Sequence, residues 1–287
     1  MGKTAIAVAV AHSLGTAVVS ADSRQCYREM TIGTAKPTPE EQGGVPHYFI
    51  DAFPVSQALT AAHYEQLSLG YLNEIFTDHN TAVVCGGTGL YIKALCEGID
   101  EMPPIDEAID AQVNEAYRQQ GLPWLQQAVQ TEDPAFFAIG ETQNPARLIR
   151  ALVFVRSTGH SITAYRSGTH KERPFQTIKI GLELPREVLY DRINQRVDIM
   201  MQHGLEAEAR ALYPQRHLKN LQTVGYAELF DYFDGSCTLQ YAVDKIKQNS
   251  RNYAKRQLTW FKKDPATTWL RSDDKDVVQK IIALAGQ

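Results

Sequence analysis

GKTAIAVAVAHSLG, residues 2–15, places a Gly-Lys-Thr tripeptide directly before a run of small apolar residues that favours a helix ending at Gly15. Such a tripeptide completes the phosphate-binding motif G-x-x-x-x-G-K-[ST], in which a strand and a loop lead into a helix. Lys3 would then hold a β-phosphate and the Thr4 hydroxyl would ligate Mg²⁺, while the helix N-terminus adds its dipole. An exposed lysine beside a helix-capping threonine is the alternative.

Strand-like and helix-like segments alternate after this stretch, which predicts a parallel α/β sheet with ligands at the carboxyl ends of its strands. Asp22 and the turn Gly86-Gly87-Thr88 fall at two such ends. The alternation therefore favours phosphate binding at Lys3 and Thr4. The expected strands are residues 16–22, 45–51 and 81–87, and the expected helices are residues 62–79 and 90–97.

The pattern changes after Gly98. IDEMPPIDEAID (residues 99–110) is acidic and interrupted by prolines, and residues 106–166 show helical patterns without a convincing strand. Strands are expected again at residues 175–184 and 267–270, and helices at residues 186–202, at 238–264 and from 273 onward. We therefore expect an α/β core made of residues 1–104 and 171–287, with a helical domain inserted at residues 105–170.

Composition narrows the class of protein. The chain has 287 residues, of which 44% are hydrophobic and 22% charged. No apolar run approaches the roughly 20 residues that a membrane span needs. The four cysteines are scattered, which suits a reducing cytoplasm rather than a zinc site or a disulfide framework. We expect a cytoplasmic protein without a membrane partner and, because no feature indicates a dimer, a monomer.

Positive charge is concentrated near the C-terminus, although the formal net charge is −4. Residues 238–263 contain seven basic residues and one acidic residue. Lys247, Arg251 and Lys255 recur every four residues, which predicts a basic stripe on one helix face. A solvated face is the ordinary explanation for such a stripe. In an acidic protein, however, this excess favours contact with a nucleic-acid backbone.

Asp22 is the candidate for chemistry. The third strand-like run ends in glycine, whereas a P-loop ATPase places a magnesium-binding aspartate at a strand end. A reaction other than ATP hydrolysis is therefore expected, with Asp22 as the strand-end acid beside the loop. Asp22 as a turn cap, and the turn at 86–88 as a purely structural feature, are the alternatives. Arg192 and Arg196 share one helix face, where they would meet either phosphate or solvent.

Together these features resemble the tRNA dimethylallyltransferase (tRNA isopentenyltransferase) family over essentially the whole chain. The matching segments are Gly2-Lys3-Thr4, SADSRQCYREMTIGTAKP (20–37), GGTGLYIKAL (86–95), RLIRAL (147–152), VGYAEL (224–229) and AKRQLTWF (254–261). The resemblance implies an α/β fold whose P-loop NTPase-like core has a parallel sheet flanked by helices, plus an inserted all-helical domain. It also implies the transfer of a dimethylallyl group from dimethylallyl diphosphate to N6 of adenosine 37, next to the tRNA anticodon, with release of diphosphate.

The resemblance carries site roles to matching positions. Asp22 is implied to be the general base, because N6 of adenine is a weak nucleophile that must lose a proton. Mg²⁺ is the implied cofactor, and the tRNA anticodon stem-loop and dimethylallyl diphosphate are the implied partners. Asp110 stands where the family often has a basic residue, so no tRNA contact is expected there. Catalytic roles are expected for Lys3, Thr4, Asp22 and Thr88, diphosphate binding for Gly2, Lys3, Thr4, Arg192 and Arg196, and metal binding for Thr4. Contacts with tRNA are expected for Asp22, Ser23, Arg24, Gln25, Thr88, Arg147, Arg150, Lys255, Arg256, Gln257, Trp260 and Lys262.

Three other functions fit parts of the sequence. A P-loop kinase for a nucleoside or small metabolite would share the Gly-Lys-Thr helix, but the missing strand-end acid opposes it. An adenylate isopentenyltransferase acting on free nucleotide would not need the extended basic face. A non-enzymatic RNA-binding protein would leave Asp22 and the turn unexplained. Since the front half of the phosphate loop would lie before Met1, we expect the chain to be an N-terminally truncated form that binds diphosphate weakly and has low or no activity.

Overall fold

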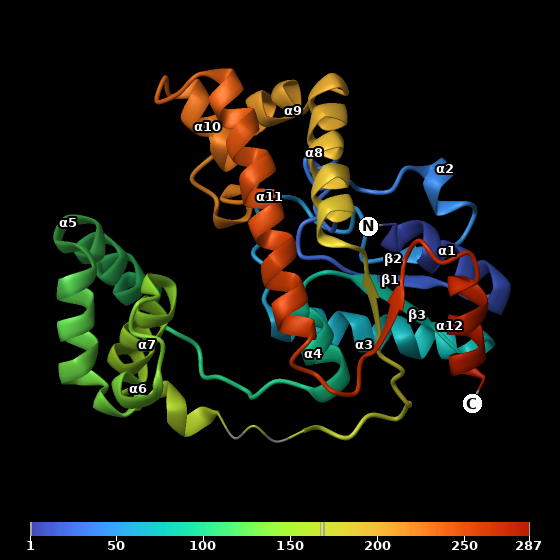
Figure 1. Ribbon diagram of the computed structural model, residues 1–287. Coiled ribbons are helices and arrows are strands. Elements are labelled where there is room, and N and C mark those ends of the chain that lie inside the picture. Colours follow the sequence, from blue (N-terminus) through green and yellow to red (C-terminus); the bar gives the residue numbers. More distant parts are fainter. Residues whose placement is uncertain (1, 167, 169, 287) are drawn as a thin grey trace. The chain divides into compact units, whose positions relative to one another are not determined.

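The computed structural model describes residues 2–166, 168 and 170–286 (Figure 1). It divides into two compact units, Met1–Glu97 with Arg173–Gln287, and Gly98–Glu172. The helices of the first unit are α1 (Lys3–Leu14), α2 (Pro39–Gln42), α3 (Ala61–Asp78), α4 (Gly89–Glu97), α8 (Arg186–Gln202), α9 (Leu205–Leu212), α10 (Ala227–Phe233), α11 (Leu239–Phe261) and α12 (Val277–Ala285), with 3-10 turns at Tyr213–Gln215 and Lys219–Leu221. Its strands are β1 (Val18–Ala21), β2 (His47–Tyr48), β3 (Val83–Gly86), β4 (Ile180–Glu183) and β5 (Thr268–Arg271).

β1 is the central strand of a three-stranded parallel sheet, with β2 on one side and β3 on the other. Successive side chains of a strand point to opposite faces. Val18 accordingly packs in a cluster with Ala11 of α1, while Val19 belongs to the cluster that contains Tyr64 of α3. Helices therefore cover both faces of this sheet, which explains why all four residues of β1 are buried. The predicted α/β fold with a parallel sheet flanked by helices is confirmed.

The predicted strand at residues 45–51 is mostly wrong. Only His47 and Tyr48 form a strand, paired with Val18 and Val19. Phe49 and Asp51 have φ angles of 63° and 52°, which lie in the left-handed region and are incompatible with a strand. Among the described residues, the later strands β4 and β5 pair with each other in a separate two-stranded parallel sheet rather than extending the first one.

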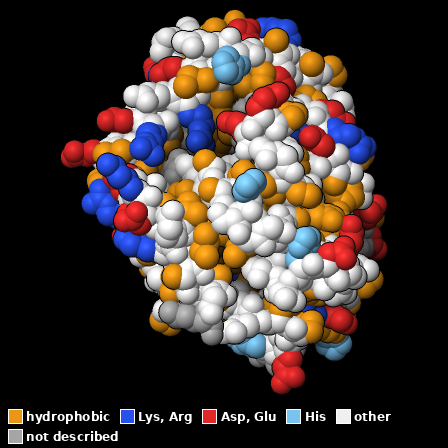
Figure 2. Space-filling view, turned by 90° about the vertical axis from the view of Figure 1, so that its right-hand side faces the viewer, with side chains coloured by type: hydrophobic (Ala, Val, Ile, Leu, Met, Phe, Trp, Pro, Cys, Tyr) orange, Lys and Arg blue, Asp and Glu red, His pale blue; other side chains and the backbone are white. Residues whose placement is uncertain are grey.

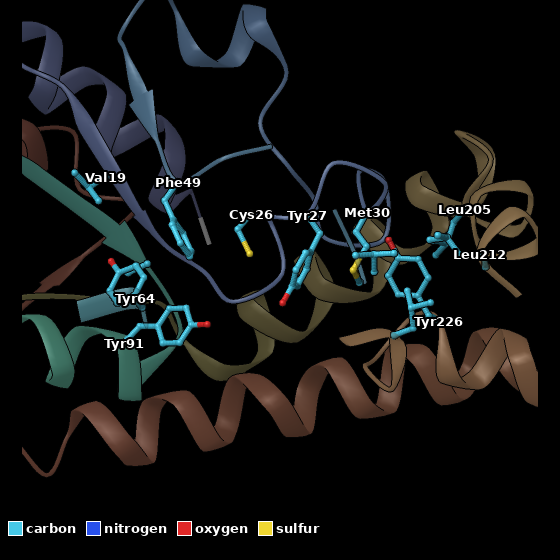
Figure 3. Close-up of a cluster of buried hydrophobic side chains, with 14 of the residues drawn as sticks. Val19, Cys26, Tyr27, Met30, Phe49, Tyr64, Tyr91, Leu205, Leu212 and Tyr226 are labelled. Carbon is cyan, nitrogen blue, oxygen red and sulfur yellow. The ribbon is translucent and has the colours of Figure 1, made fainter. Parts of the chain in front are cut away.

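An aromatic cluster ties α3 and α4 together beneath the first sheet (Figure 3). The rings of Tyr64 and Tyr91 are stacked with centroids 4.2 Å apart, and the Phe49 ring meets Tyr64 edge-on at 4.9 Å. Both arrangements are the favourable ones for aromatic pairs. The cluster therefore holds α4, and with it the turn between β3 and α4, against the core.

The described elements of the second unit are all helical, namely α5 (Glu107–Glu132), α6 (Pro134–Ile139), α7 (Pro145–Thr158) and a 3-10 turn (Ile162–Tyr165). α5 is interrupted at Gly121, whose φ of 74° and ψ of −169° are non-helical, just before Pro123. α7 starts where the Asn144 side chain caps the helix and Pro145 occupies its first turn. The unit has its own apolar core, in which α5 packs against α7.

Candidate active site

The candidate site lies where β1 and β3 end. Ala21 is paired with Gly86, so Asp22 and the turn Gly87-Thr88 leave the sheet side by side. The Thr88 N–H donates to the Ala21 carbonyl at 3.1 Å. The Thr88 Oγ1 accepts the Ser23 N–H at 3.1 Å and donates to the Ser23 Oγ at 3.3 Å. The structure therefore joins the predicted residues Ser23 and Thr88 by hydrogen bonds, directly beside Asp22.

Asp22 is oriented by its own backbone neighbours. Its Oδ1 accepts the N–H of Arg24 at 2.9 Å and of Gln25 at 3.3 Å. Its Oδ2 receives no hydrogen bond from the described residues. The Gln25 side chain, in turn, donates to the carbonyls of Thr34 and Ala35, both at 3.1 Å. One carboxylate oxygen is thus fixed by the loop, and the other is available to accept a proton.

Lys3 approaches the same turn from the first residue of α1. Gly2 is the N-cap residue of this helix, with no side-chain cap, so the first N–H groups of α1 can bind an anion. A Cβ on Gly87 would lie 2.1 Å from the Gln257 Nε2 and 3.0 Å from the Lys3 Nζ. Only a residue without a side chain therefore lets both groups reach the turn.

The charges of Lys3 and Asp22 both act on the thiol of Cys85, in the strand that leads into the turn. Burial raises the pKa of the Cys85 thiol, the positive charge of Lys3 lowers it, and the negative charge of Asp22 raises it. Both charges act on the half-buried Cys85 side chain of β3. A cation and a carboxylate therefore both lie near the turn that follows β3.

α11 closes the site with the predicted residues Gln257 and Trp260. The Gln257 Nε2 donates to the Gly87 carbonyl at 2.8 Å. The indole of Trp260 lies against Gly89, where a Cβ would come within 2.3 Å of its Nε1, and yet 44% of Trp260 is exposed. An exposed aromatic ring beside the turn provides a surface on which a nucleobase can stack.

Tyr253 is a site residue that the sequence reasoning did not select. Loss of water around the hydroxyl is the main cause that raises the pKa of Tyr253, and the negative charge of Asp22 adds to it. The neighbouring side chains of Gln257 and Thr88 lower the pKa of its hydroxyl. The spacing of Tyr253, Gln257 and Trp260 (i, i+4, i+7) places all three on one helix face, and this spacing was the available signal.

The predicted basic stripe on α11 is only partly directed to solvent. The Lys247 Nζ lies 2.6 Å from a carboxylate oxygen of Asp198, and the Arg251 Nη1 donates to the Asn194 Oδ1 at 2.6 Å, so both side chains face α8. Lys255 and Arg256 are exposed. The reason is that α8 packs along α11, so polar side chains of α8 pair with the basic side chains of α11 that face it. On the face drawn in Figure 2, basic and acidic side chains are likewise mixed.

Within the described residues of the first unit, the other predicted cations make no contact with the Lys3 group. Arg192 and Arg196 are exposed on α8, and the positive charge of Arg192 acts on Asp273. The Lys262 Nζ lies 3.2 Å from a carboxylate oxygen of Glu183. In the second unit, the Arg147 Nη1 lies 2.8 Å from a carboxylate oxygen of Glu141, and Arg150 is exposed on the same helix.

The donor chemistry of the site suits magnesium rather than a metal held by the protein alone. Within the described residues, no three His, Cys, Asp or Glu side chains form a metal-binding group. Magnesium that serves a phosphorylated substrate needs only one or two protein oxygens, because substrate oxygens and water complete its shell. The Thr4 hydroxyl in the first turn of α1 is an oxygen donor of this kind.

Among the helices described, none is long and apolar enough to cross a membrane.

A helix N-terminus with a lysine, set beside a carboxylate at adjoining ends of parallel strands, is the arrangement expected of an α/β enzyme that acts on a phosphorylated substrate. The IPP transferase family model matches residues 25–264. The chain is 46% identical to tRNA dimethylallyltransferase 1 of Phocaeicola vulgatus over 98% of this chain and 94% of that protein. It is also 46% identical to tRNA dimethylallyltransferase of Cytophaga hutchinsonii over 93% of this chain and 88% of that protein.

Among solved structures, the full-length tRNA isopentenylpyrophosphate transferase of Bacillus halodurans superimposes with a TM-score of 0.73 at 38% sequence identity. The match covers 99% of this chain and 92% of that one. The chain therefore belongs to the IPP transferase family, a family of prenyl-transferring enzymes. This membership confirms the expected resemblance and the P-loop NTPase-like core, and the kinase and free-nucleotide alternatives do not match it.

Proposed function

We propose that this chain transfers the dimethylallyl group of dimethylallyl diphosphate to N6 of adenosine 37, beside the tRNA anticodon, and releases diphosphate. The observation that carries the proposal is the meeting of Lys3, Asp22 and Thr88 at the turn between β3 and α4. This arrangement supports the proposal, because it brings a lysine that could bind the diphosphate and a carboxylate that could accept the proton to the same turn.

The N-terminus of α1 would bind the diphosphate that leaves in the reaction. Negative charge accumulates on the diphosphate as the bond between its oxygen and C1 of the dimethylallyl group breaks. The Lys3 ammonium and the first N–H groups of α1 stabilise that charge. Thr4 would hold Mg²⁺, which when bound also neutralises the leaving group. Arg192 and Arg196 remain candidates for a further contact with diphosphate.

The loop that follows β1 would accept the proton that adenine N6 loses. N6 of adenine forms the new bond to C1 and loses one proton, which the free Oδ2 of Asp22 accepts. Thr88, Ser23 and Gln257 hold the surrounding turns. Atoms balance, because the products are the N6-prenylated adenosine, diphosphate and one proton.

The tRNA half uses exposed residues. The target base must leave its stack to reach Asp22, and the indole of Trp260 offers it a stacking surface. Gln25 and Arg24 border Asp22 on the loop side, and Lys255, Arg256 and Lys262 on α11 and just beyond it would contact phosphates. We assign Arg147 and Arg150 of the inserted helical domain (residues 105–170) to the anticodon stem-loop. We place the reaction in the cytoplasm and assign it to a monomer.

The deciding experiment follows radiolabel from dimethylallyl diphosphate into an unmodified anticodon stem-loop that carries adenosine 37. We expect Mg²⁺-dependent label in N6-dimethylallyladenosine after nuclease digestion, one diphosphate per label, and no label when position 37 is guanosine. Phosphoryl transfer from ATP would instead establish a kinase. Label in free AMP but not in the stem-loop would establish the free-nucleotide enzyme.

Lys3→Ala is expected to lower kcat/KM for dimethylallyl diphosphate about 10- to 100-fold. The reason is that a hydrogen bond to a charged group contributes about 1.5–3 kcal/mol. Steady-state kinetics with the donor varied at saturating stem-loop measures the loss. Lys275→Ala, at an exposed lysine outside the site, is the matched control and leaves kcat/KM unchanged. An equal effect of both variants would remove Lys3 from the diphosphate site.

Lys255→Gln is expected to weaken binding of all stem-loop sequences to a similar extent. The slope of log K against log salt concentration falls by roughly 0.7–0.9, the change expected for one lost phosphate contact. Fluorescence anisotropy across a salt series measures it. Lys247→Gln on the same helix is the control, because its ammonium pairs with Asp198. A slope that changes with Lys247 and not with Lys255 would reverse the assignment of the basic face.

A further inference from the structure

Glu208 of α9 organises the loop that carries Asp22, although it is far from Asp22 in the sequence. The loop leaves β1 and contains neither helix nor strand between residues 22 and 38 apart from a single bridge at Tyr27. The Glu208 Oε2 accepts the N–H of Thr31 at 3.1 Å and of Ile32 at 2.8 Å, and its Oε1 accepts the N–H of Gly33 at 2.9 Å. Three successive backbone N–H groups thus converge on one carboxylate, as they do in an anion-binding nest.

Tyr226 completes this anchor. Its hydroxyl donates to the Glu208 Oε1 at 2.6 Å. Burial, followed by the negative charge of Glu208, raises the pKa of Tyr226, which therefore stays a protonated donor. The ring is fully buried in the cluster that contains Met30 and Leu205 (Figure 3). A Cβ on Gly33 would come within 2.6 Å of that ring, so the loop packs directly on it.

Hydrogen bonds continue from this anchor to Asp22. Thr34 and Ala35 follow the three anchored residues, and their carbonyls accept the Gln25 side chain at 3.1 Å. The Gln25 N–H then donates to the Asp22 Oδ1 at 3.3 Å. A path of hydrogen bonds and short backbone segments therefore runs from Glu208 to the carboxylate.

We propose that Glu208 is a positioning residue for the transfer reaction, holding Asp22 in its proton-accepting orientation through the turn at residues 31–35 and Gln25. The inference rests on the proposed function for the role of Asp22. A glutamine cannot replace the carboxylate, because its amide has one acceptor oxygen and its NH₂ would face backbone donors.

Glu208→Gln is expected to lower kcat at least tenfold while KM for dimethylallyl diphosphate changes less than threefold, since the α1 phosphate site is untouched. Glu206→Gln is the matched control, because Glu206 lies on the same helix and pairs with Arg210 at its surface. Should Glu208→Gln fail to fold, Tyr226→Phe removes one donor to the carboxylate and is expected to lower kcat two- to fivefold with KM unchanged. A wild-type kcat in the folded variant, or a loss confined to KM, would overturn the proposal.

Amide hydrogen exchange tests the path without relying on activity. In Glu208→Gln, the amides of Arg24 and Gln25 are expected to exchange at least tenfold faster than in the wild type, together with those of residues 31–33. Faster exchange at residues 31–33 with unchanged exchange at Arg24 and Gln25 would show a local anchor only and overturn the proposal. Failure of the wild type to prenylate the stem-loop would contradict the proposed function, whereas this exchange result would still decide whether Glu208 holds Asp22.

Discussion

Asp22→Asn is expected to lower the rate of dimethylallyl transfer about 10²- to 10⁴-fold, the range in which a general base contributes. Asparagine keeps the shape of the side chain and an Oδ1 that can accept the N–H groups of Arg24 and Gln25. It cannot accept the proton that N6 must lose. Single-turnover transfer of labelled dimethylallyl to the stem-loop measures the rate, and separate binding assays measure each substrate.

The binding measurements separate a catalytic loss from a structural one. Affinities for dimethylallyl diphosphate and for the stem-loop are expected to stay within a few-fold of the wild type, because Lys3 and the exposed residues of α11 are unchanged. Asp78→Asn, at the exposed C-terminal end of α3, serves as the control and keeps the wild-type rate. A wild-type rate in Asp22→Asn would exclude Asp22 as the base.

Arg173→Met is expected to lower the free energy of unfolding by about 3–5 kcal/mol, the cost of removing one partner from a buried ion pair. The guanidinium lies 2.7 Å from a carboxylate oxygen of Glu65, and each side chain is 9% exposed. It also donates to the carbonyls of Ala94 and Leu95 at 2.7 Å, near the end of α4. Arg173 thus joins α3 to α4, the two helices whose aromatic cluster supports the site.

Urea unfolding, with the midpoint and slope fitted together, measures this change. Arg271→Met is the control, because its pair with Asp273 is exposed to water and contributes little to stability. The double variant Glu65→Met with Arg173→Met is expected to recover part of the loss, since apolar replacement of a buried pair is often tolerated. Equal losses in Arg173→Met and Arg271→Met would show that burial does not strengthen the Arg173 pair.

Local patterns predicted much of the fold. The expected helix at residues 186–202 is α8 with the same bounds, and the expected helix at 238–264 contains α11. Local patterns did not predict the true extent of the strand at 45–51. Phe49 is buried like a strand residue, but its backbone is left-handed, and nothing in its neighbours indicates this. The pairing of β4 with β5 likewise depends on packing rather than on the pattern of either strand.

The sequence by itself determined which chemical groups were available. The Gly-Lys-Thr start of a helix, an aspartate after the first strand and a glycine turn after another imply a phosphate site beside a carboxylate. These features follow from periodicity and local backbone preferences, which involve only neighbouring residues.

The tertiary structure alone decided which of several chemically equal side chains are paired with other groups of the protein and which are exposed. Lys247 and Lys255 have the same spacing, yet Lys247 pairs with Asp198 of α8. Glu206 and Glu208 are only two residues apart in the chain. Glu206 pairs with Arg210 of its own helix, whereas Glu208 accepts the N–H of Gly33, which is 175 residues away. The physical reason is that an ion pair or an anchoring hydrogen bond needs two groups within a few ångströms, and for distant residues only the packing of the elements brings them that close.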